Sequence, residues 1–259
     1  MARRRHSNRR RRRGSLGFLY KVLSMLVICA AIVAALTLFF RVDEIVVTGQ
    51  QRYTQQEIVA ATGMERGDNL FLMNKFDVAQ RIVNDLPYIK ETRINRKLPD
   101  TLLIDVEECG TPLAVMQDGA AWLVSPGSEA SGRLKIVEQT EVSAAAEYGV
   151  IDGCQLLAPA VGTSLALATE YAAQQSSLRD LLFALEDAGM LDQVDAVHLG
   201  DLSVLTMDYA ERFAVELPYG ADYGYKLRAL KFVIENLETN QTGTIELVRD
   251  DGRVNFIPN

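Results

Sequence analysis

The sequence has few of the residues from which catalytic and metal sites are built. Histidine occurs only twice in 259 residues, at His6 and His198, so no two histidines have the spacing of metal ligands. The motifs G-x-S-x-G and S-x-x-K do not occur, which argues against the corresponding serine hydrolases. We therefore expect no catalytic residue, no metal and no cofactor, and we interpret His198 as a structural or surface residue. The carboxylate pairs Glu107-Glu108 and Asp250-Asp251 fall at predicted strand or turn ends, where we expect them to be solvated.

Cysteine is also scarce, and its three occurrences are Cys29, Cys109 and Cys154. Cys29 falls within a long apolar run. The other two are 45 residues apart and show no framework pattern. A disulfide between them is chemically permitted in an oxidising compartment, but we favour two free, partly buried thiols.

Charged residues are absent from Val22 to Phe40, a run of nineteen residues. At about 1.5 Å per residue, a helix of this length covers roughly 28 Å, close to the hydrocarbon thickness of a bilayer. A cleaved signal peptide is the alternative, but its apolar region is only about 7 to 15 residues long and precedes a small-x-small site. Here the run ends in Leu36-Thr37-Leu38-Phe39-Phe40, so we predict an uncleaved single-pass anchor.

Basic and acidic residues are unevenly distributed along the chain. Eight arginines, at positions 3–5 and 9–13, precede the apolar run and predict a cytoplasmic N-terminus, with everything after Arg41 on the far side of the membrane. Nine of the 27 basic residues and none of the 34 acidic residues precede Arg41, which leaves the outer part with a net charge of −16. Such an acidic body is unsuited to binding nucleic acid.

The residues after Arg41 predict a strand and a short helix. Val42 to Gly49 is a β-branched run that ends in glycine, as strands commonly do. Thr54 and Glu57 have the spacing of a capping box, and Gly63 has the position of a helix C-terminal stop.

A second helix and a hairpin are predicted next. From Asn74 to Pro87 apolar residues recur at helical spacing. They are Phe76, Val78, Ala79, Ile82, Val83 and Leu86. Residues 88–96 and 101–108 then form two strand candidates, joined by the turn 97–100. The second candidate alternates apolar and polar residues, which is typical of a strand with one buried face.

This β-α-α-β-β unit, placed directly after a lone membrane helix, resembles a POTRA domain. It is most similar to the version found in the FtsQ/DivIB family of bacterial cell-division proteins. The resemblance rests on Val46-Val47-Thr48-Gly49, on Asn84-Asp85-Leu86-Pro87-Tyr88-Ile89 and on Lys97-Leu98-Pro99-Asp100-Thr101-Leu102. The run from Pro87 to Leu102 is its most specific part.

Residues 110–259 predict a second, strand-rich domain. The turn Asp118-Gly119 separates two strand candidates, 112–115 and 121–127, as in a hairpin. The segment 164–189 has leucines at helical spacing and ends in glycine. Three short strand candidates follow at 194–199, 203–209 and 212–217. We assign no structure to the alanine-rich region 144–173.

The chain ends with a predicted helix, 222–237, and a closing hairpin whose strands are 244–248 and 253–258. This ending also resembles the β domain of FtsQ/DivIB proteins. The resemblance therefore implies an α+β fold with one N-terminal transmembrane helix, a POTRA domain and a mixed, strand-rich β domain with a C-terminal helix and hairpin. The implied divisions are a cytoplasmic tail (1–17), the transmembrane helix (18–40), the POTRA domain (41–109) and the β domain (110–259).

The resemblance also implies a function. It indicates a non-catalytic divisome scaffold at the division septum, which binds FtsB/DivIC-type and FtsL-type coiled-coil proteins and links them to the septal peptidoglycan synthase complex. The implied partner-binding residues are Tyr223, Tyr225, Lys226, Arg249, Asp251, Gly252, Val254 and Phe256. Val254 and Phe256 alternate on one predicted strand face, so a core position is equally open for both.

Two other functions remain as alternatives. The first is a membrane-anchored cell-wall enzyme whose nucleophile lies in the unassigned region, where Ser143, Ser164 and Cys154 are the candidates. None of these has an adjacent base in the sequence. The second is a POTRA module of a secretion or assembly system, for which several POTRA repeats would be usual and only one is recognised here.

Overall fold

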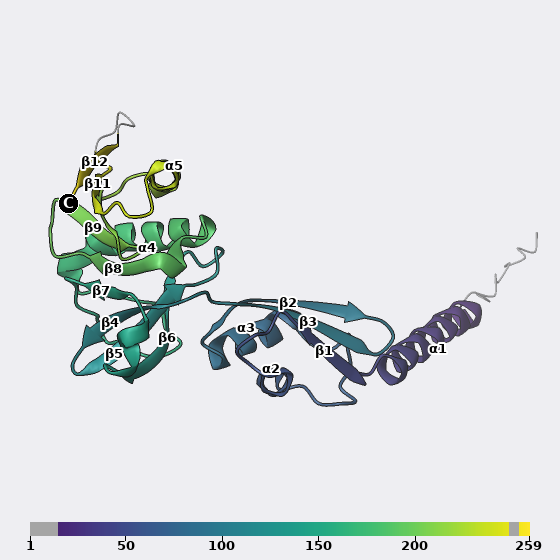
Figure 1. The fold of residues 1–259 in the computed structure, drawn as a ribbon. Helices are drawn as coiled ribbons and strands as arrows, with labels where there is room; N and C mark the ends of the chain where they lie inside the picture. The colour runs from purple at the N-terminus through teal and green to yellow at the C-terminus, as the bar shows by residue number, and fades with distance from the viewer. Residues whose placement is uncertain (1–14, 249–253) are drawn as a thin grey trace, which may run out of the picture.

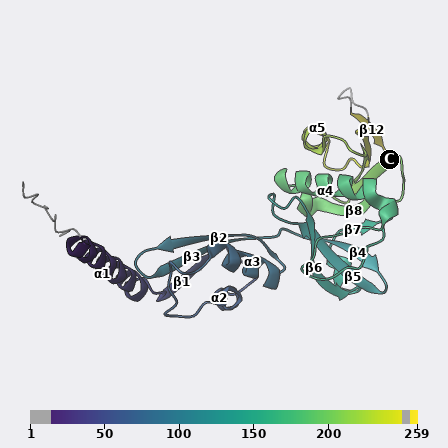
Figure 2. The same ribbon diagram turned by 180° about the vertical axis from the view of Figure 1, so that it is seen from behind.

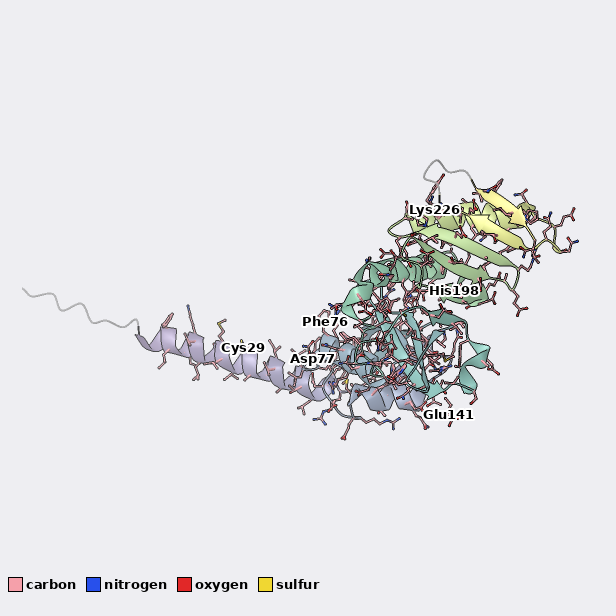
Figure 3. The ribbon with its side chains drawn as sticks, turned by 90° about the vertical axis from the view of Figure 1, so that its left-hand side faces the viewer. Cys29, Phe76, Asp77, Glu141, His198 and Lys226 are labelled. Carbon is pink, nitrogen blue, oxygen red and sulfur yellow. The ribbon has the colours of Figure 1, made fainter. Side chains whose placement is uncertain are left out.

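The computed structural model describes residues 15–248 and 254–259. Helix α1 (Ser15–Phe39) projects from one end of an elongated molecule, and a small sheet separates it from a larger one (Figure 1). Its stretch Gly17–Phe39 is long and apolar enough to cross a membrane, and its side chains are not packed in a protein core. Cys29 lies near the middle of this helix (Figure 3). The predicted transmembrane helix is therefore confirmed.

The predicted β-α-α-β-β order of the next unit is also confirmed. Its elements are β1 (Glu44–Thr48), α2 (Gln55–Thr62), α3 (Lys75–Asp85), β2 (Ile89–Lys97) and β3 (Thr101–Glu108). Strand β3 is central, parallel to β1 and antiparallel to β2. The two helices and the sheet share one apolar core, which includes Ile58, Val78, Ile82, Leu102 and Ile104.

The ends of α2 follow from the sequence. The Thr54 hydroxyl accepts a hydrogen bond from the Glu57 amide at 3.3 Å, and the Glu57 carboxylate accepts one from the Thr54 amide at 2.8 Å. This capping box satisfies amides that have no partner within the helix. Gly63 then adopts a left-handed conformation with φ of 62°, which ends the helix.

Two side chains of this unit have surroundings that the sequence pattern did not show. Phe76, which belongs to the predicted apolar stripe of α3, is 73% exposed, because it lies in the first turn of the helix, beyond the buried Val78 and Ile82. Glu108 is not simply solvated, because its carboxylate accepts hydrogen bonds from three backbone amides of the loop before α2, at 2.8 to 3.3 Å. It therefore holds that loop against the end of β3.

The second sheet has nine strands in the order β12-β11-β10-β9-β8-β7-β4-β5-β6. Its strands are β4 (Leu113–Gln117), β5 (Ala120–Pro126), β6 (Leu134–Glu141), β7 (Val150–Asp152), β8 (Val194–His198), β9 (Val204–Tyr209), β10 (Phe213–Pro218), β11 (Gly243–Glu246) and β12 (Asn255–Pro258). Its helices are α4 (Ala172–Asp187) and α5 (Tyr223–Asn236), with 3-10 turns at Ala144–Glu147, Thr169–Tyr171 and Leu191–Gln193. The α+β fold class is confirmed.

Helices α4 and α5 pack with the sheet in one large core (Figures 1 and 2). The leucines that face this core from α4 are fully buried, as are alternate residues of the neighbouring strands. They include Leu178, Leu181, Leu185, Val197, Met207, Val215 and Ile245. The residues between the buried strand positions point to the opposite face, which is partly exposed.

The region between β5 and α4 contains structure that the sequence did not predict. Strand β6 pairs with β5, and β7 lies between β4 and β8, parallel to both. Gly149 allows the close approach of β7 and β8, because a Cβ there would lie 2.2 Å from the carbonyl oxygen of Val194. The helix expected in 164–189 begins only at Ala172. Residues Ser164 and Leu167 instead form isolated bridges to Lys135 and Leu156.

The two sheets are joined by a packed junction. Tyr88 is 7% exposed and clusters with residues of the second sheet, among them Ala114, Ala121, Leu123 and Val137. Lys90 of β2 lies 2.9 Å from Glu186 of α4, and the ammonium of Lys135 on β6 donates to the carbonyl of Val83 at the end of α3. The domain boundaries proposed at residues 17, 40 and 109 stay predictions.

Candidate partner-binding surface

The nine-stranded sheet ends at β12. This strand is antiparallel to β11, with Ile257 opposite Thr244 and Phe256 opposite Ile245. In the described part of the chain no strand pairs with its other side. An unpaired strand edge is a template for another extended chain.

The phase of the ladder identifies the groups on this edge. The amide of Asn259 donates to the carbonyl of Thr242 at 3.1 Å. Because hydrogen-bonded pairs alternate along antiparallel strands, Ile257 and Asn255 also turn their polar groups toward β11. The backbone N–H and C=O of Phe256 therefore point outward, along the edge.

The side chains of the closing segment divide between core and surface. Phe256 packs edge-on against Phe213, with ring centroids 6.3 Å apart, and both Phe256 and Val254 are partly buried against the main core. Ile257, on the other face, is 45% exposed. Arg249, Asp251 and Gly252, which complete the predicted site in this hairpin, lie outside the described residues.

Helix α5 lies next to these strands (Figures 1 and 2). Asp222 caps its N-terminus by accepting a hydrogen bond from the Tyr225 amide at 2.9 Å. Tyr223 is 2% exposed and donates to the carbonyl of Pro218, and Lys226 is 5% exposed, so neither offers surface area in this conformation. Tyr225 is 46% exposed and is the predicted residue of this helix that is available for contact.

Two further exposed apolar residues at this end of the molecule were not identified from the sequence. Phe232 on α5 is 68% exposed, and Val248, directly before the segment that is not described, is 42% exposed. Helical spacing alone does not find Phe232, because its neighbours Val233 and Ile234 pack on the core. We call the strand edge and the exposed apolar side chains on both sides of it the terminal surface: β12, Tyr225, Phe232, Val248 and Ile257.

The comparison with known proteins bears on both sheets. Residues 40–108 match the family model described as POTRA domain, FtsQ-type. A cell division protein FtsQ from Corynebacterium glutamicum is 27% identical over 172 residues, which cover 66% of this chain and 73% of that protein. The chain thus carries a POTRA domain of the FtsQ type and is similar to cell-division proteins of the FtsQ/DivIB family. A cell division protein FtsQ from Novosphingobium aromaticivorans is 39% identical over 82 residues, covering 30% of this chain and 24% of that protein. A cell division protein DivIB from Clostridium botulinum is 30% identical over 91 residues, covering 34% and 35%.

In the β domain, His198 has polar contacts that its sequence position did not reveal. Its Nδ1 lies 2.8 Å from a carboxylate oxygen of Asp152 on β7, and its Nε2 lies 3.1 Å from one of Asp208 on β9. Burial lowers the pKa of His198, but the hydrogen bonds to Asp208 and Asp152 outweigh burial and leave the pKa above its usual value. The imidazole thus joins three strands on the open face of the sheet.

The same face carries an acidic cleft of about 710 Å³ at one end of the strands. Its lining includes Asp192, Asp195, Asp208, Glu211 and Arg212. The Arg212 guanidinium is bonded to the carbonyls of Glu238 and Gln241. Among the residues that the structure describes, no group of three or more His, Cys, Asp or Glu is arranged to hold a metal ion.

The candidate nucleophiles of a cell-wall enzyme lie in separate segments of the chain. Burial raises the pKa of the Cys154 thiol to about 11, and the nearby charge of Asp152 acts in the same direction. A thiol with this pKa is almost entirely protonated at neutral pH and is a poor nucleophile. Ser143 contacts only the carboxylate of Glu141 at 3.5 Å, and Ser164 pairs through its backbone with Lys135. Cys154 and Cys109 are both free thiols.

Proposed function

We propose that this chain is a non-catalytic divisome scaffold that captures an extended segment of an FtsB/DivIC-type protein on its terminal surface. The same contact would bring in the FtsL-type partner and link both to septal peptidoglycan synthesis. The observation that carries the proposal is the unpaired outer edge of β12, at the end of a nine-stranded sheet. The FtsQ-type POTRA domain and the similarity to FtsQ and DivIB cell-division proteins support the divisome role.

Strand addition explains how such a surface binds. A partner strand would take its main-chain hydrogen bonds from the outward N–H and C=O of Phe256, which supply affinity. The ring of Phe256 is packed against Phe213 and keeps β12 in place while the backbone is engaged. Tyr225, Phe232 and Ile257 then offer exposed apolar area to partner side chains, which supplies selectivity.

The proposed topology puts the terminal surface outside the cytoplasm. The arginine-rich tail favours retention of the N-terminus in the cytoplasm, so both sheets would lie on the other side of the membrane at the septum. A fluorescent fusion at the N-terminus tests the location, because a divisome protein concentrates at midcell, whereas an even signal around the envelope contradicts the proposal.

A six-residue deletion tests the binding mode. The full chain and a variant that lacks residues 254–259 are each co-expressed with the FtsB/DivIC-type and FtsL-type proteins of the same organism and purified from detergent. We expect the deletion to abolish recovery of both partners, while thermal melting shows that the rest of the sheet remains folded. Leu202→Ser, at a position that is 78% exposed, is the matched surface control and retains both partners. Full recovery of the partners with the folded deletion variant would disprove strand addition at β12.

A further inference from the structure

The POTRA domain exposes a cluster of large apolar side chains on the side where α1 enters it. We call it the membrane-side cluster. It consists of Phe71, Leu72, Phe76 and Leu98, which are 45%, 77%, 73% and 53% exposed. Contiguous exposed apolar side chains of this kind mark a surface that contacts a partner or a membrane.

The loop that carries this cluster is bonded to the end of the membrane helix. The amide of Leu70 donates to the carbonyl of Phe40 at 3.0 Å. The side-chain amide of Asn69 donates to the carbonyls of Leu36 and Thr37 at 3.0 and 3.2 Å, so it caps the last turn of α1. These bonds fix the position of the loop relative to the helix.

Aromatic contacts continue the apolar surface of α1 onto the POTRA domain. The ring of Phe40 contacts the ring of Phe71 edge-on, with centroids 5.0 Å apart, and Phe39 packs on Phe40 in the same way. Phe76 follows five residues after Phe71, in the first turn of α3. Phe71 therefore extends the apolar surface of α1 onto the loop that carries the cluster.

The length of α1 fixes the depth of the cluster. The apolar stretch Gly17–Phe39 has 23 residues and, at about 1.5 Å per residue, spans roughly 34 Å against a hydrocarbon core of about 30 Å. Its C-terminal end, and Phe71 in contact with it, therefore lie at the level of the lipid headgroups. Phenylalanine and leucine side chains can bury their apolar surface at the boundary between headgroups and acyl chains, as they do in interfacial amphipathic helices.

Both basic and acidic side chains occur around the membrane-side cluster, so we expect it to contact lipid headgroups without a strong preference for anionic lipids. Arg96 donates to the carbonyl of Met73 and lies 5.9 Å from the ring of Phe71. The ammonium of Lys75 lies 5.2 Å from the ring of Phe76. Asp77 lies in the same first turn of α3 as Lys75, and Asp100 lies in the turn between β2 and β3, so negative charges also occur in these segments.

We propose that the membrane-side cluster inserts into the headgroup region of the bilayer leaflet from which α1 emerges. The POTRA domain is then held against the phospholipid surface at two points, the membrane helix and the cluster, instead of swinging on a single tether. This orientation would also set the direction in which the β domain extends from the membrane. The inference depends on the membrane helix and not on the partner bound at the terminal surface.

Tryptophan fluorescence in vesicles tests this contact. The full chain with Trp122→Phe has no tryptophan of its own, and Leu72→Trp or Phe76→Trp introduces one at the cluster. Leu202→Trp is the matched control, because Leu202 is 78% exposed and Leu72 is 77% exposed, but Leu202 lies in the β domain. Each variant is reconstituted in phosphatidylcholine vesicles whose acyl chains carry bromine close to the headgroup, since bromine quenches tryptophan on contact.

We expect strong quenching and blue-shifted emission for Leu72→Trp and Phe76→Trp, and the emission of a hydrated, unquenched residue for Leu202→Trp. Only this protein and lipid are present, so no protein partner can produce the effect. Equal and weak quenching at all three positions would overturn the proposal and would assign the cluster to a protein partner. If Trp122→Phe does not fold, the three tryptophan substitutions are made in the chain that keeps Trp122. The quenching of Trp122 is then measured in the unsubstituted chain and subtracted.

Discussion

Tyr88 donates a hydrogen bond from its phenol to the carboxylate of Glu138 across the junction between the POTRA and β domains. The guanidinium of Arg52 lies 3.7 Å above the Tyr88 ring and 3.4 Å from the same carboxylate. Burial raises the pKa of Tyr88, as does the hydrogen bond to Glu138, so the phenol keeps its proton at physiological pH. This donor therefore remains available to lock the two domains together.

Tyr88→Phe is expected to loosen the junction without unfolding either domain. The variant keeps the buried ring and loses one hydrogen bond to a carboxylate, which can be hydrated because its side chain is 43% exposed. We therefore expect a loss of only about 1 kcal/mol in the free energy of unfolding, together with faster amide exchange in residues 109–114. Tyr225→Phe, at a tyrosine that is 46% exposed, serves as the control. Unchanged exchange at the junction would show that packing alone holds the domains.

Two adjacent carboxylates allow a sharper comparison. Glu108 accepts from the amides of Gln51, Arg52 and Tyr53, whereas the Glu107 side chain is 57% exposed and shares Lys90 with Glu186. Glu108→Gln is expected to cost about 1–2 kcal/mol, because charge-assisted bonds to three amides are lost or weakened. Glu107→Gln is expected to cost less than about 0.5 kcal/mol. Urea unfolding of the two variants measures the difference, and equal losses would contradict the anchoring role of Glu108.

The contacts of His198 predict a pH dependence. Its folded-state pKa is raised, so its stabilising contribution is complete below the unfolded value of about 6.5 and is lost as the pH rises through the folded value. His198→Gln should therefore be less stable than the unsubstituted chain at pH 6, with a smaller difference at pH 9. We expect a difference below about 1 kcal/mol, because the side chain is 38% exposed and its bonds to Asp152 and Asp208 are screened by solvent. A difference that is constant across this range would exclude a charged His198.

Features that depend on neighbouring residues in the sequence were predictable. The capping box at Thr54 and Glu57, and the Asp118-Gly119 turn, which has φ of 54° and 77°, were each identified from two residues. Strand β7 was not, because three residues show no periodicity and its place in the sheet depends on pairing with β4 and β8. The sequence pattern of a short segment does not show which distant strands it pairs with.

The candidate partner-binding surface was likewise predictable only where it depends on local sequence. Helix α5 and the final hairpin were expected from their periodicity, but burial within α5 was not, and it separates Tyr225 from Tyr223 and Lys226. Phe76 belongs to the apolar stripe predicted from helical spacing, which does not show what covers each of its positions. For the first turn of α3, that covering surface is the membrane in our proposal.

Asn69 joins two parts of the molecule through one side chain. Its amide nitrogen donates to the carbonyls of Leu36 and Thr37 in α1, and its oxygen accepts from the amides of Phe71 and Leu72 at 2.8 and 3.1 Å. The donor half holds the membrane helix, and the acceptor half shapes the loop of the membrane-side cluster. Two substitutions separate these contributions.

Asn69→Asp keeps the acceptor but removes the donor, and it places a negative charge at the C-terminal end of α1, where the helix dipole disfavours it. We expect the amide of Leu70, which is bonded to Phe40, to exchange roughly three- to tenfold faster, as the loss of a bond of about 1 kcal/mol predicts, while the amides of Phe71 and Leu72 stay protected. Asn69→Ala removes both halves, so all three amides should exchange faster. Hydrogen exchange of the reconstituted full chain measures each site, with Asn95→Ala, at an exposed position on β2, as the control. If the amides of Phe71 and Leu72 exchange as fast in Asn69→Asp as in Asn69→Ala, the acceptor oxygen does not shape the loop. Loss of the contact with α1 would then be enough to release these amides.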